Sequence, residues 1–409
     1  MQGKNKQLQR YLNLEIKQLL KKGYSGLILG PRQTGKTTLV KSLLSDYPEK
    51  IEYLLQIPSV RQEIESDTGL VIRQVEARKK KPIIFVDESQ KIPEVFDSAQ
   101  YLIDERKATF IFTGSSARKL RKIGTNLLPG RIKKFFLDPL LWGELGLIKE
   151  NTIPEIALAN INPAFDYSFN KAMVHGSLPG LVDLPPEDRS DFLKSYAEIY
   201  LEEEIRAEAL SRKIGAFGRF LELAAIESGT SPNFSKLSNE SGVSQPAIKE
   251  FYRLLEDTLV AERIDPFLKN ARKRILSTPR FYFFDIGVRN SLARLPLDAK
   301  IINAQKGILF EHAVILEIIR RIRVLKKNYK VCFWRTAAGA EVDCVIDTGS
   351  TVIPIEIKSG RKVVLSEIKG LKNFLDDYKK IAPRGYVITQ GSEKEKLAEN
   401  IIALPWNCL

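Results

Sequence analysis

Two glycines, a lysine and two threonines stand at a spacing that could bind phosphate. Gly30 and Gly35 bracket four residues, and Lys36, Thr37 and Thr38 follow directly. Glycines let the backbone turn so that successive amide groups point at anionic oxygens. The lysine adds positive charge for terminal phosphates, and the first threonine hydroxyl can ligate Mg²⁺. The pattern predicts a triphosphate-binding loop between a strand and a helix, and this order argues against a chance glycine-rich turn.

Two adjacent carboxylates follow a buried apolar run further along the chain. The run 83–86 precedes Asp87 and Glu88. Behind a phosphate-binding loop, the first acid orients the Mg²⁺ shell and the second polarises the attacking water. We therefore expect Thr37 and Asp87 to hold Mg²⁺ beside ATP, and Glu88 to be catalytic.

Two further candidates come from the next strand and the loop that follows it. Thr113 and Ser115 end the strand and could sense the γ-phosphate, although a polar strand-to-helix turn explains them equally well. Arg131 follows Leu128-Pro129-Gly130 and is our candidate for an arginine finger, which stabilises transition-state charge. A finger that acts on a neighbouring subunit would require a homo-oligomer.

A second group of acidic residues lies near the C-terminus. The segments 341–347 and 352–358 are predicted to form a hairpin around a Gly-Ser turn. This register places Asp343 opposite Glu356, with Lys358 on the same face. The other face is apolar and buried. It comprises Val342, Cys344, Ile346, Ile353, Ile355 and Ile357.

Two carboxylates that face each other across a strand pair repel, so we expect another group to compensate for the repulsion between Asp343 and Glu356. A divalent cation such as Mg²⁺, held by Asp343, Glu356 and Glu311 from a preceding helix, would provide this compensation and could activate water for phosphodiester cleavage. Lys358 could then orient the nucleophile or stabilise developing charge. The alternative is a solvated hairpin face with an ordinary lysine–glutamate pair.

The elements that must position the first group alternate strand and helix, which is typical of a parallel α/β sheet. The candidate strands are 26–29, 53–57, 83–87, 109–113 and 134–137. They predict an α/β P-loop NTPase domain, AAA+-like, over 1–145. We expect a helical connecting or lid region over 146–228, with a helix at 196–210.

The segment 229–285 is predicted to form a winged helix-turn-helix. A short helix, a glycine-containing turn and a helix ending near Asp257 come first. The strands 259–264 and 280–285 follow as a wing, and a basic loop at 269–274 suits a phosphate backbone. Such a module contacts either DNA or protein. The rest, 286–409, carries the second acidic group.

The overall composition favours a soluble protein that binds polyanions. The chain has 409 residues, a formal net charge of +14 and three widely spaced cysteines. The charge favours nucleic acid as a partner, although a merely basic protein is the alternative. No apolar run is long enough to span a membrane and no secretory signal is present, so we expect a cytoplasmic protein.

Together these motifs resemble a family of prokaryotic AAA-type ATPases with a C-terminal DUF4143 domain similar to the PD-(D/E)XK nuclease fold. Gly30–Thr37 and 83–88 look like its Walker A and Walker B motifs, and 284–290 resembles the signature that opens its C-terminal part. The nuclease pattern departs at Val342, where a proline is usual. The resemblance implies a restriction-endonuclease-like α/β domain at the C-terminus and a homo-oligomer, with a hexamer as one candidate.

Our interpretation is a Mg²⁺-dependent ATPase that remodels or translocates DNA, with an endonuclease-like C-terminal site acting on branched or single-stranded DNA. Contact with DNA would be to backbone and shape, because no aromatic pattern for reading bases is present. The main alternative is a regulatory ATPase switch whose C-terminal domain binds nucleic acid or a partner protein without cutting. A protein remodeller indifferent to nucleic acid is a third.

Overall fold

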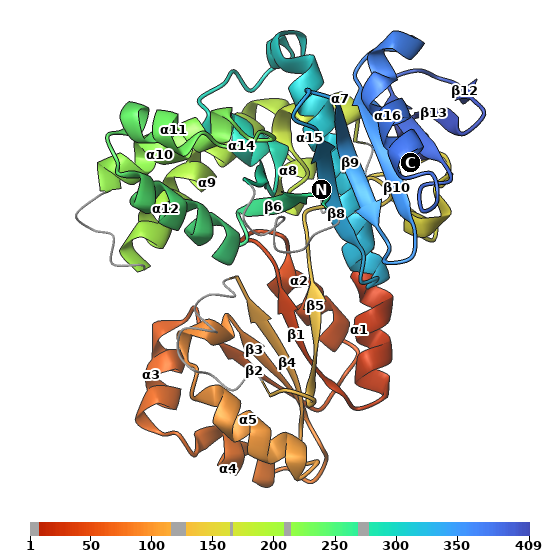
Figure 1. The fold of residues 1–409 in the computed structure, drawn as a ribbon. Coiled ribbons are helices and arrows are strands. Elements are labelled where there is room, and N and C mark those ends of the chain that lie inside the picture. The colour runs from red at the N-terminus through yellow and green to blue at the C-terminus, as the bar shows by residue number, and fades with distance from the viewer. Residues whose placement is uncertain (1–7, 116–127, 164–166, 208–213, 269–277) are drawn as a thin grey trace. The chain divides into compact units, whose positions relative to one another are not determined.

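The computed structural model describes residues 8–115, 128–163, 167–207, 214–268 and 278–409. It divides into two compact units, each with its own sheet (Figure 1). The N-terminal unit comprises Leu8–Leu140 with Asp257–Val260, and the C-terminal unit comprises Leu141–Glu256 and Ala261–Leu409. Apart from Asp257–Val260, the three segments expected after the ATPase domain therefore lie in one unit.

The N-terminal unit is built on a five-stranded sheet whose neighbouring strands all pair in parallel, as the alternating pattern predicts. In spatial order its strands are β2 (Lys50–Leu54), β3 (Ile83–Asp87), β4 (Thr109–Gly114), β1 (Ser25–Leu29) and β5 (Ile132–Phe136). The prediction for β2 was wrong by three residues. This edge strand alternates polar and apolar side chains, whereas the prediction followed the apolar run that starts within it and continues beyond it.

Helices cover both faces of this sheet, which explains why its central strands are almost wholly apolar. The helices α1 (Tyr11–Lys21) and α2 (Lys36–Leu44) share one hydrophobic core with Ile28 and Ile111. The opposite core contains Leu27 and Phe112 together with side chains of α3 (Pro58–Ser66), α4 (Leu70–Glu76) and α5 (Val95–Asp104). The sheet is thus a rigid support whose carboxyl edge carries the phosphate-binding loop.

The C-terminal unit begins with a helical part. Its helices are α7 (Phe169–His175), α8 (Pro179–Val182), α9 (Pro186–Ala207), α10 (Ile214–Ile226), α11 (Phe234–Ser241) and α12 (Gln245–Asp257). The helix expected at 196–210 is the C-terminal part of α9, as far as the described residues extend. The two helices and the glycine turn predicted here are present: Asn233 caps α11, and Gly242 takes the left-handed φ of +70° in the turn before α12.

An eight-stranded mixed sheet forms the rest of this unit. Its order is β12 (Glu395–Ala398), β13 (Ile401–Pro405), β11 (Gly385–Thr389), β10 (Val352–Lys358), β9 (Glu341–Asp347), β8 (Lys330–Arg335), β6 (Ala261–Pro266) and β7 (Arg280–Phe283). The predicted wing strands are β6 and β7, which pair antiparallel. However, β6 also pairs with β8, so the wing continues the sheet of the C-terminal part. The basic loop at 269–274 lies outside the described residues.

Three helices flank these strands. The short helix α14 (Ile286–Leu292) follows β7, and its first turn is capped by Asp285. The long helix α15 (Lys300–Leu325) packs on one face of the sheet and α16 (Lys369–Asp377) on the other. None of the helices in the described part of the chain is long and apolar enough to cross a membrane.

The predicted hairpin is β9 and β10, and its register is the predicted one because Cys344 pairs with Ile355. The predicted placement of Val342 on the same face as Cys344 was wrong. The pairing of β9 with β8, on its other side, is irregular: Cys332 of β8 pairs with Val345, but Trp334 pairs with Val342. This bulge moves Val342 to the core beneath α16, while Cys344 stays in the core beneath α15.

Candidate functional sites

The predicted phosphate-binding loop joins β1 to α2. Gly35 adopts φ +88° at the N-cap of α2, a conformation that other residues adopt only with strain. Gly30 is required for space, because a Cβ there would lie 2.2 Å from the carbonyl oxygen of Leu137. The loop thus directs the free amide groups of the first turn of α2 toward one place, which is the arrangement that binds phosphate. Thr38 is exposed in that turn.

Lys36 lies inside the loop. Its ammonium group donates hydrogen bonds to the carbonyl oxygens of Gly30 at 2.9 Å and Pro31 at 2.7 Å. Burial lowers the pKa of Lys36 to about 8. A bound phosphate would replace these carbonyl partners with stronger charged ones.

Arg10 stabilises the same loop, although no motif in the sequence marks it as a site residue. Its guanidinium donates to the carbonyl oxygens of Thr34 at 3.0 Å and Asp138 at 2.6 Å. These two bonds tie the loop to the segment that follows β5. Sequence reasoning missed Arg10 because both acceptors are backbone atoms.

The two residues expected to hold Mg²⁺ come together. The Thr37 hydroxyl donates to Asp87 Oδ1 at 2.8 Å. Asp87 is buried at the carboxyl end of β3 and also accepts a hydrogen bond of 2.6 Å from the Thr113 hydroxyl. A hydroxyl and a carboxylate at this separation fit a Mg²⁺ ion bound to ATP. Because the Thr113 hydroxyl donates its one proton to Asp87, its role as a γ-phosphate sensor stays a prediction.

Glu88 follows in a left-handed conformation with φ +55°, which is rare for a residue with a side chain. Its backbone amide donates to Thr113 Oγ1 at 3.1 Å. Its carboxylate accepts hydrogen bonds from Ser115 Oγ at 3.0 Å and from Gln90 Nε2. The residue expected to act on water is therefore held by two neighbouring side chains.

Gln90 was missed by the sequence analysis. It lies in the 3₁₀ turn Ser89–Lys91, which folds back so that its amide nitrogen also reaches Ser115 Oγ at 3.1 Å. The only available signal was an amide side chain two residues after the second acid.

Arg131 lies far from the phosphate-binding loop of its own chain. It precedes β5, whose first residue pairs with the first residue of β1, whereas the loop follows the last residue of β1. A five-residue strand spans about 13 Å, so the two sites are on opposite edges of the sheet. The Arg131 guanidinium forms a two-point ion pair with Asp104, at 2.6 and 2.9 Å. A catalytic role for Arg131 would have to be on another subunit.

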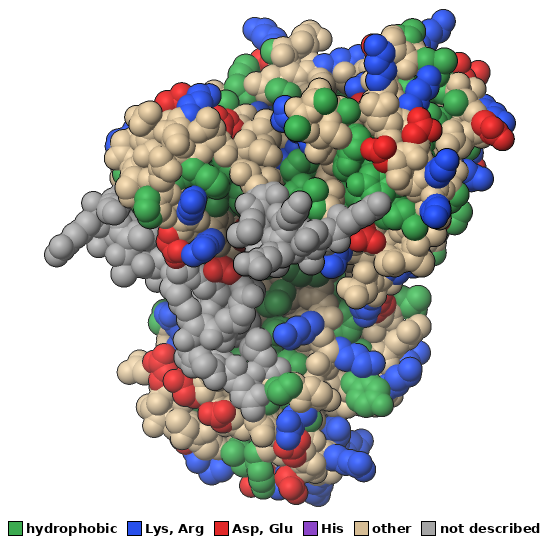
Figure 2. Space-filling view, viewed as in Figure 1, with side chains coloured by type: hydrophobic (Ala, Val, Ile, Leu, Met, Phe, Trp, Pro, Cys, Tyr) green, Lys and Arg blue, Asp and Glu red, His purple; other side chains and the backbone are tan. Residues whose placement is uncertain are grey.

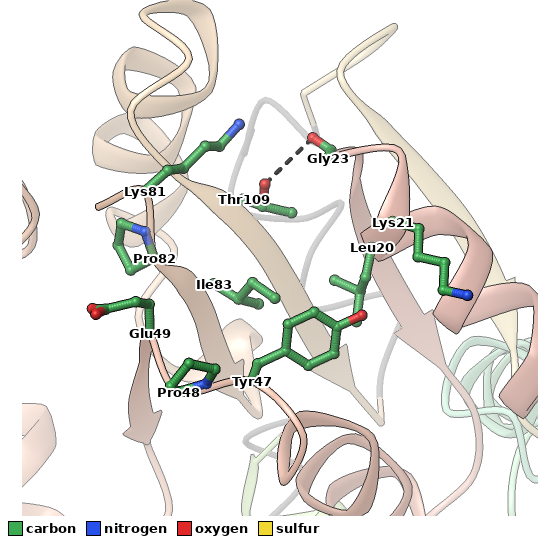
Figure 3. Close-up of a pocket in the computed structure, with 10 residues that line it drawn as sticks. All are labelled: Leu20, Lys21, Gly23, Tyr47, Pro48, Glu49, Lys81, Pro82, Ile83 and Thr109. Atoms are coloured by element: carbon green, nitrogen blue, oxygen red, sulfur yellow. Dashed lines mark hydrogen bonds between the residues drawn. The ribbon is translucent and has the colours of Figure 1, made fainter.

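A pocket of about 280 Å³ opens at the edge of the sheet where the strands begin, which is the edge opposite the phosphate-binding loop (Figure 3). It is lined by Leu20, Lys21, Gly23, Tyr47, Pro48, Glu49, Lys81, Pro82, Ile83 and Thr109. Ile83 and Thr109 are the first residues of their strands, and the Thr109 hydroxyl donates to the Gly23 carbonyl at 3.3 Å. The pocket is therefore distinct from the nucleotide site.

The second acidic group gathers where β7, β9, β10 and α15 meet. Asp343 of β9 accepts a hydrogen bond of 2.8 Å from the backbone amide of Ile357. Glu356 of β10 forms an ion pair of 2.7 Å with Lys358. Glu311 of α15 instead accepts a hydrogen bond of 2.7 Å from the hydroxyl of Tyr282, on β7.

The carboxylates of this cluster are buried and repel one another. Burial and the charge of Asp343 raise the pKa of Glu356 to about 8 and that of Glu311 to about 7. Burial also raises the pKa of Asp343. Among the described residues, no three His, Cys, Asp or Glu side chains are arranged as a ready metal site. A cation held by Glu311, Asp343 and Glu356 together therefore stays a prediction.

Comparison with known proteins identifies three regions. Residues 24–146 match the model of an AAA domain, residues 166–299 match a domain of unknown function, DUF8612, and residues 306–409 match another, DUF4143. The chain therefore carries an AAA-type P-loop domain, followed by two domains whose descriptions name no activity. The expected DUF4143 region is confirmed.

Similar proteins add little about activity. Uncharacterized proteins of Mycobacterium bovis and Mycobacterium tuberculosis are each 23% identical over 386 residues, covering 93% of this chain and 79% of theirs. A Walker-type ATPase of Pyrococcus abyssi, PABY2304, is 14% identical with a TM-score of 0.44, over 71% of this chain and 98% of that one. PCH-2 of Caenorhabditis elegans is 14% identical with a TM-score of 0.21, over 61% and 65%.

Proposed function

We propose that this protein hydrolyses ATP with Mg²⁺ and uses the turnover to remodel or translocate DNA. The observation that carries the first part is the 2.8 Å hydrogen bond between Thr37 and Asp87, at the end of the same loop that encloses the Lys36 ammonium group. Hydroxyl, carboxylate and ammonium groups around one loop are what a Mg²⁺–triphosphate needs.

Each residue then has a distinct task. The loop amides and Lys36 bind the phosphates, while Thr37 and Asp87 hold the cation. Bound Mg²⁺ neutralises charge that develops on the phosphate oxygens. Glu88 accepts a proton from the attacking water, and to do so it must exchange its hydrogen bonds with Ser115 and Gln90 for one with that water.

Phosphate release from ATP tests this assignment. The wild type should release phosphate only with Mg²⁺, and Lys36→Ala should not. Lys41→Ala, an exposed lysine on the same helix, is the matched control and should behave as wild type. Equal release by wild type and Lys36→Ala would refute the proposal.

DNA as the partner is supported by the net charge of +14 and by the helix-turn-helix of α11 and α12. Figure 2 shows Lys and Arg side chains in several groups over the visible face, interspersed with acidic ones. On this face, charge therefore does not mark one docking stripe. Adding linear, single-stranded and branched DNA separately to the ATPase assay tests the partner, and a rate indifferent to all three would favour a protein-directed or regulatory ATPase.

A second function, metal-dependent phosphodiester cleavage by the C-terminal unit, is favoured by one specific atom. Glu356 Oε2 is buried and has no hydrogen-bond partner within the described part of the chain, although Asp343 is near enough to raise the pKa of Glu356. A buried carboxylate oxygen without a partner is costly, and a cation would satisfy it.

In that case Asp343 and Glu356 would hold the cation, which when bound would supply activation of water or stabilisation of the leaving oxygen. Lys358 already contacts Glu356 and lies where it can stabilise charge on the phosphate. Cleavage of labelled DNA with Mg²⁺ or Mn²⁺ should be lost in Asp343→Ala and retained in Lys36→Ala. Cleavage retained in Asp343→Ala would refute it and leave a domain that only binds.

A further inference from the structure

The edge of the N-terminal sheet where the strands begin carries a row of exposed basic side chains. The row extends over four adjacent strands, which are β3, β4, β1 and β5 in spatial order. These strands start side by side, because Ile83 pairs with Thr109 and Ser25 pairs with Ile132. The row, which we call the basic edge, comprises Lys79, Lys80 and Lys81 before β3, Arg106 before β4, Lys21 and Lys22 before β1, and Lys133 in β5.

The cations of the basic edge lie close to one another. Lys21 and Lys81 both line the pocket of Figure 3, where their side chains come from opposite sides. A Cβ on Gly23 would lie 4.0 Å from Nζ of Lys81, so that lysine also reaches the start of β1. Burial and the charge of Arg106 lower the pKa of Lys81. Like charges therefore gather at this edge, and an anion bound among them would relieve their repulsion.

The acidic side chains nearby do not neutralise the basic edge. Within the described ranges its cations form no ion pair, and Glu105, exposed beside Arg106, forms none either. Three other acids of this region are each paired with a cation outside the row: Glu49 with Arg78, Glu76 with Lys107, and Asp104 with Arg131. Positive charge is thus left in surplus where the strands begin.

The dimensions of the basic edge suit a nucleic-acid backbone. Neighbouring strands of a sheet lie about 4.8 Å apart, so four adjacent strand starts span about 14 Å. Along one strand of B-DNA a phosphate recurs about every 3.4 Å, so this length faces about four phosphates. At the β5 end, the Lys133 ammonium lies over the exposed ring of Tyr24 at 5.1 Å, which keeps it beside the start of β1.

We propose that the basic edge binds the phosphate backbone of DNA. The inference rests on DNA as the proposed partner and names the surface of the AAA domain that contacts it. The strands β1, β3 and β4 each begin at this edge and end at the nucleotide site. DNA and ATP would therefore bind at opposite ends of the same strands, and neither would block the other.

Binding of labelled linear, single-stranded and branched DNA to the full-length protein, measured without nucleotide at several salt concentrations, tests the basic edge. Lys80→Gln/Lys81→Gln removes two cations at the β3 end of the row, and Lys22→Gln/Lys133→Gln removes two at the β1 and β5 end. Each phosphate contact contributes about 0.7 to 0.9 to the slope of log affinity against log salt. Each double variant should therefore lower the slope by about 1.5 to 2 and weaken binding about tenfold or more at about 0.1 M salt.

Lys379→Gln/Lys380→Gln is the matched control, because it removes two adjacent exposed lysines from the C-terminal unit. It should bind DNA as the wild type does, and equal unfolding midpoints should show that all three variants fold. Failure of the wild type to bind any of the three DNAs would refute DNA as the partner and the basic edge with it. Wild-type binding that is unchanged in either edge variant, or equally weakened in the control, would refute the basic edge alone.

Discussion

Gln90 donates a hydrogen bond to the carboxylate of Glu88, two residues before it in the chain. The same amide nitrogen reaches Ser115, which directly follows the neighbouring strand β4, so the proposed general base is held by side chains that follow two adjacent strands. Under the proposed function, Glu88 must give up these partners during turnover.

Removing this restraint should raise ATP turnover in the absence of DNA. A net hydrogen bond is worth about 1 kcal/mol, so we expect Gln90→Ala to increase the basal rate up to about fivefold. Phosphate release at saturating ATP measures it, with the exposed Gln62→Ala as control. A lower rate in Gln90→Ala would mean that Gln90 helps Glu88 rather than restrains it.

Nucleotide affinity should depend on pH through Lys36. Its pKa is lowered to about 8 by burial, so the ammonium form dominates below that pH and is lost above it. Binding of a non-hydrolysable ATP analogue should weaken about tenfold as the pH rises from about 7 to about 9. The Lys36→Ala variant should bind weakly with no such dependence, and a wild-type curve that is also flat would contradict the assignment.

Arg131 should act between subunits if it acts at all. Arg131→Ala should lose ATPase activity, and mixing it with Lys36→Ala should restore part of it, because each variant supplies the residue that the other lacks. Asp104→Asn, which weakens the ion pair within the chain, should not abolish activity. Full activity in Arg131→Ala alone would exclude the arginine-finger role.

Glu356→Gln should stabilise the protein when metal is absent. It replaces a buried carboxylate that lies near Asp343 and has one oxygen without a partner. We expect the free energy of unfolding in the presence of a chelator to rise by about 1–3 kcal/mol, as measured by denaturant unfolding. A destabilised variant would show that the ion pair with Lys358 outweighs the repulsion.

Much of the N-terminal unit could be predicted from the sequence because its chemistry is local. The loop 30–37 and the pair Asp87–Glu88 each sit where a strand ends, and parallel strands bring such ends to one edge. Gln90 could not be predicted, because only the left-handed turn at Glu88 aims it backwards.

The C-terminal cluster was predicted only in part, because half of it depends on pairing between distant strands. The register of β9 and β10 follows from a short turn. In contrast, Tyr282 reaches Glu311 only because β6 joins β7 to the larger sheet. The bulge that moves Val342 is likewise a property of β8 and β9 together.

The Mg²⁺–ATP site around Thr37 and Asp87 is the part of the molecule on which the proposed function depends most. The direct measurement is phosphate release from ATP by purified full-length protein, with and without Mg²⁺, for the wild type and for Glu88→Gln. We predict Mg²⁺-dependent release by the wild type, and at least about 100-fold slower release by Glu88→Gln with nucleotide binding intact, as for the loss of a general base. Release that proceeds equally in Glu88→Gln, or without Mg²⁺, would contradict the account.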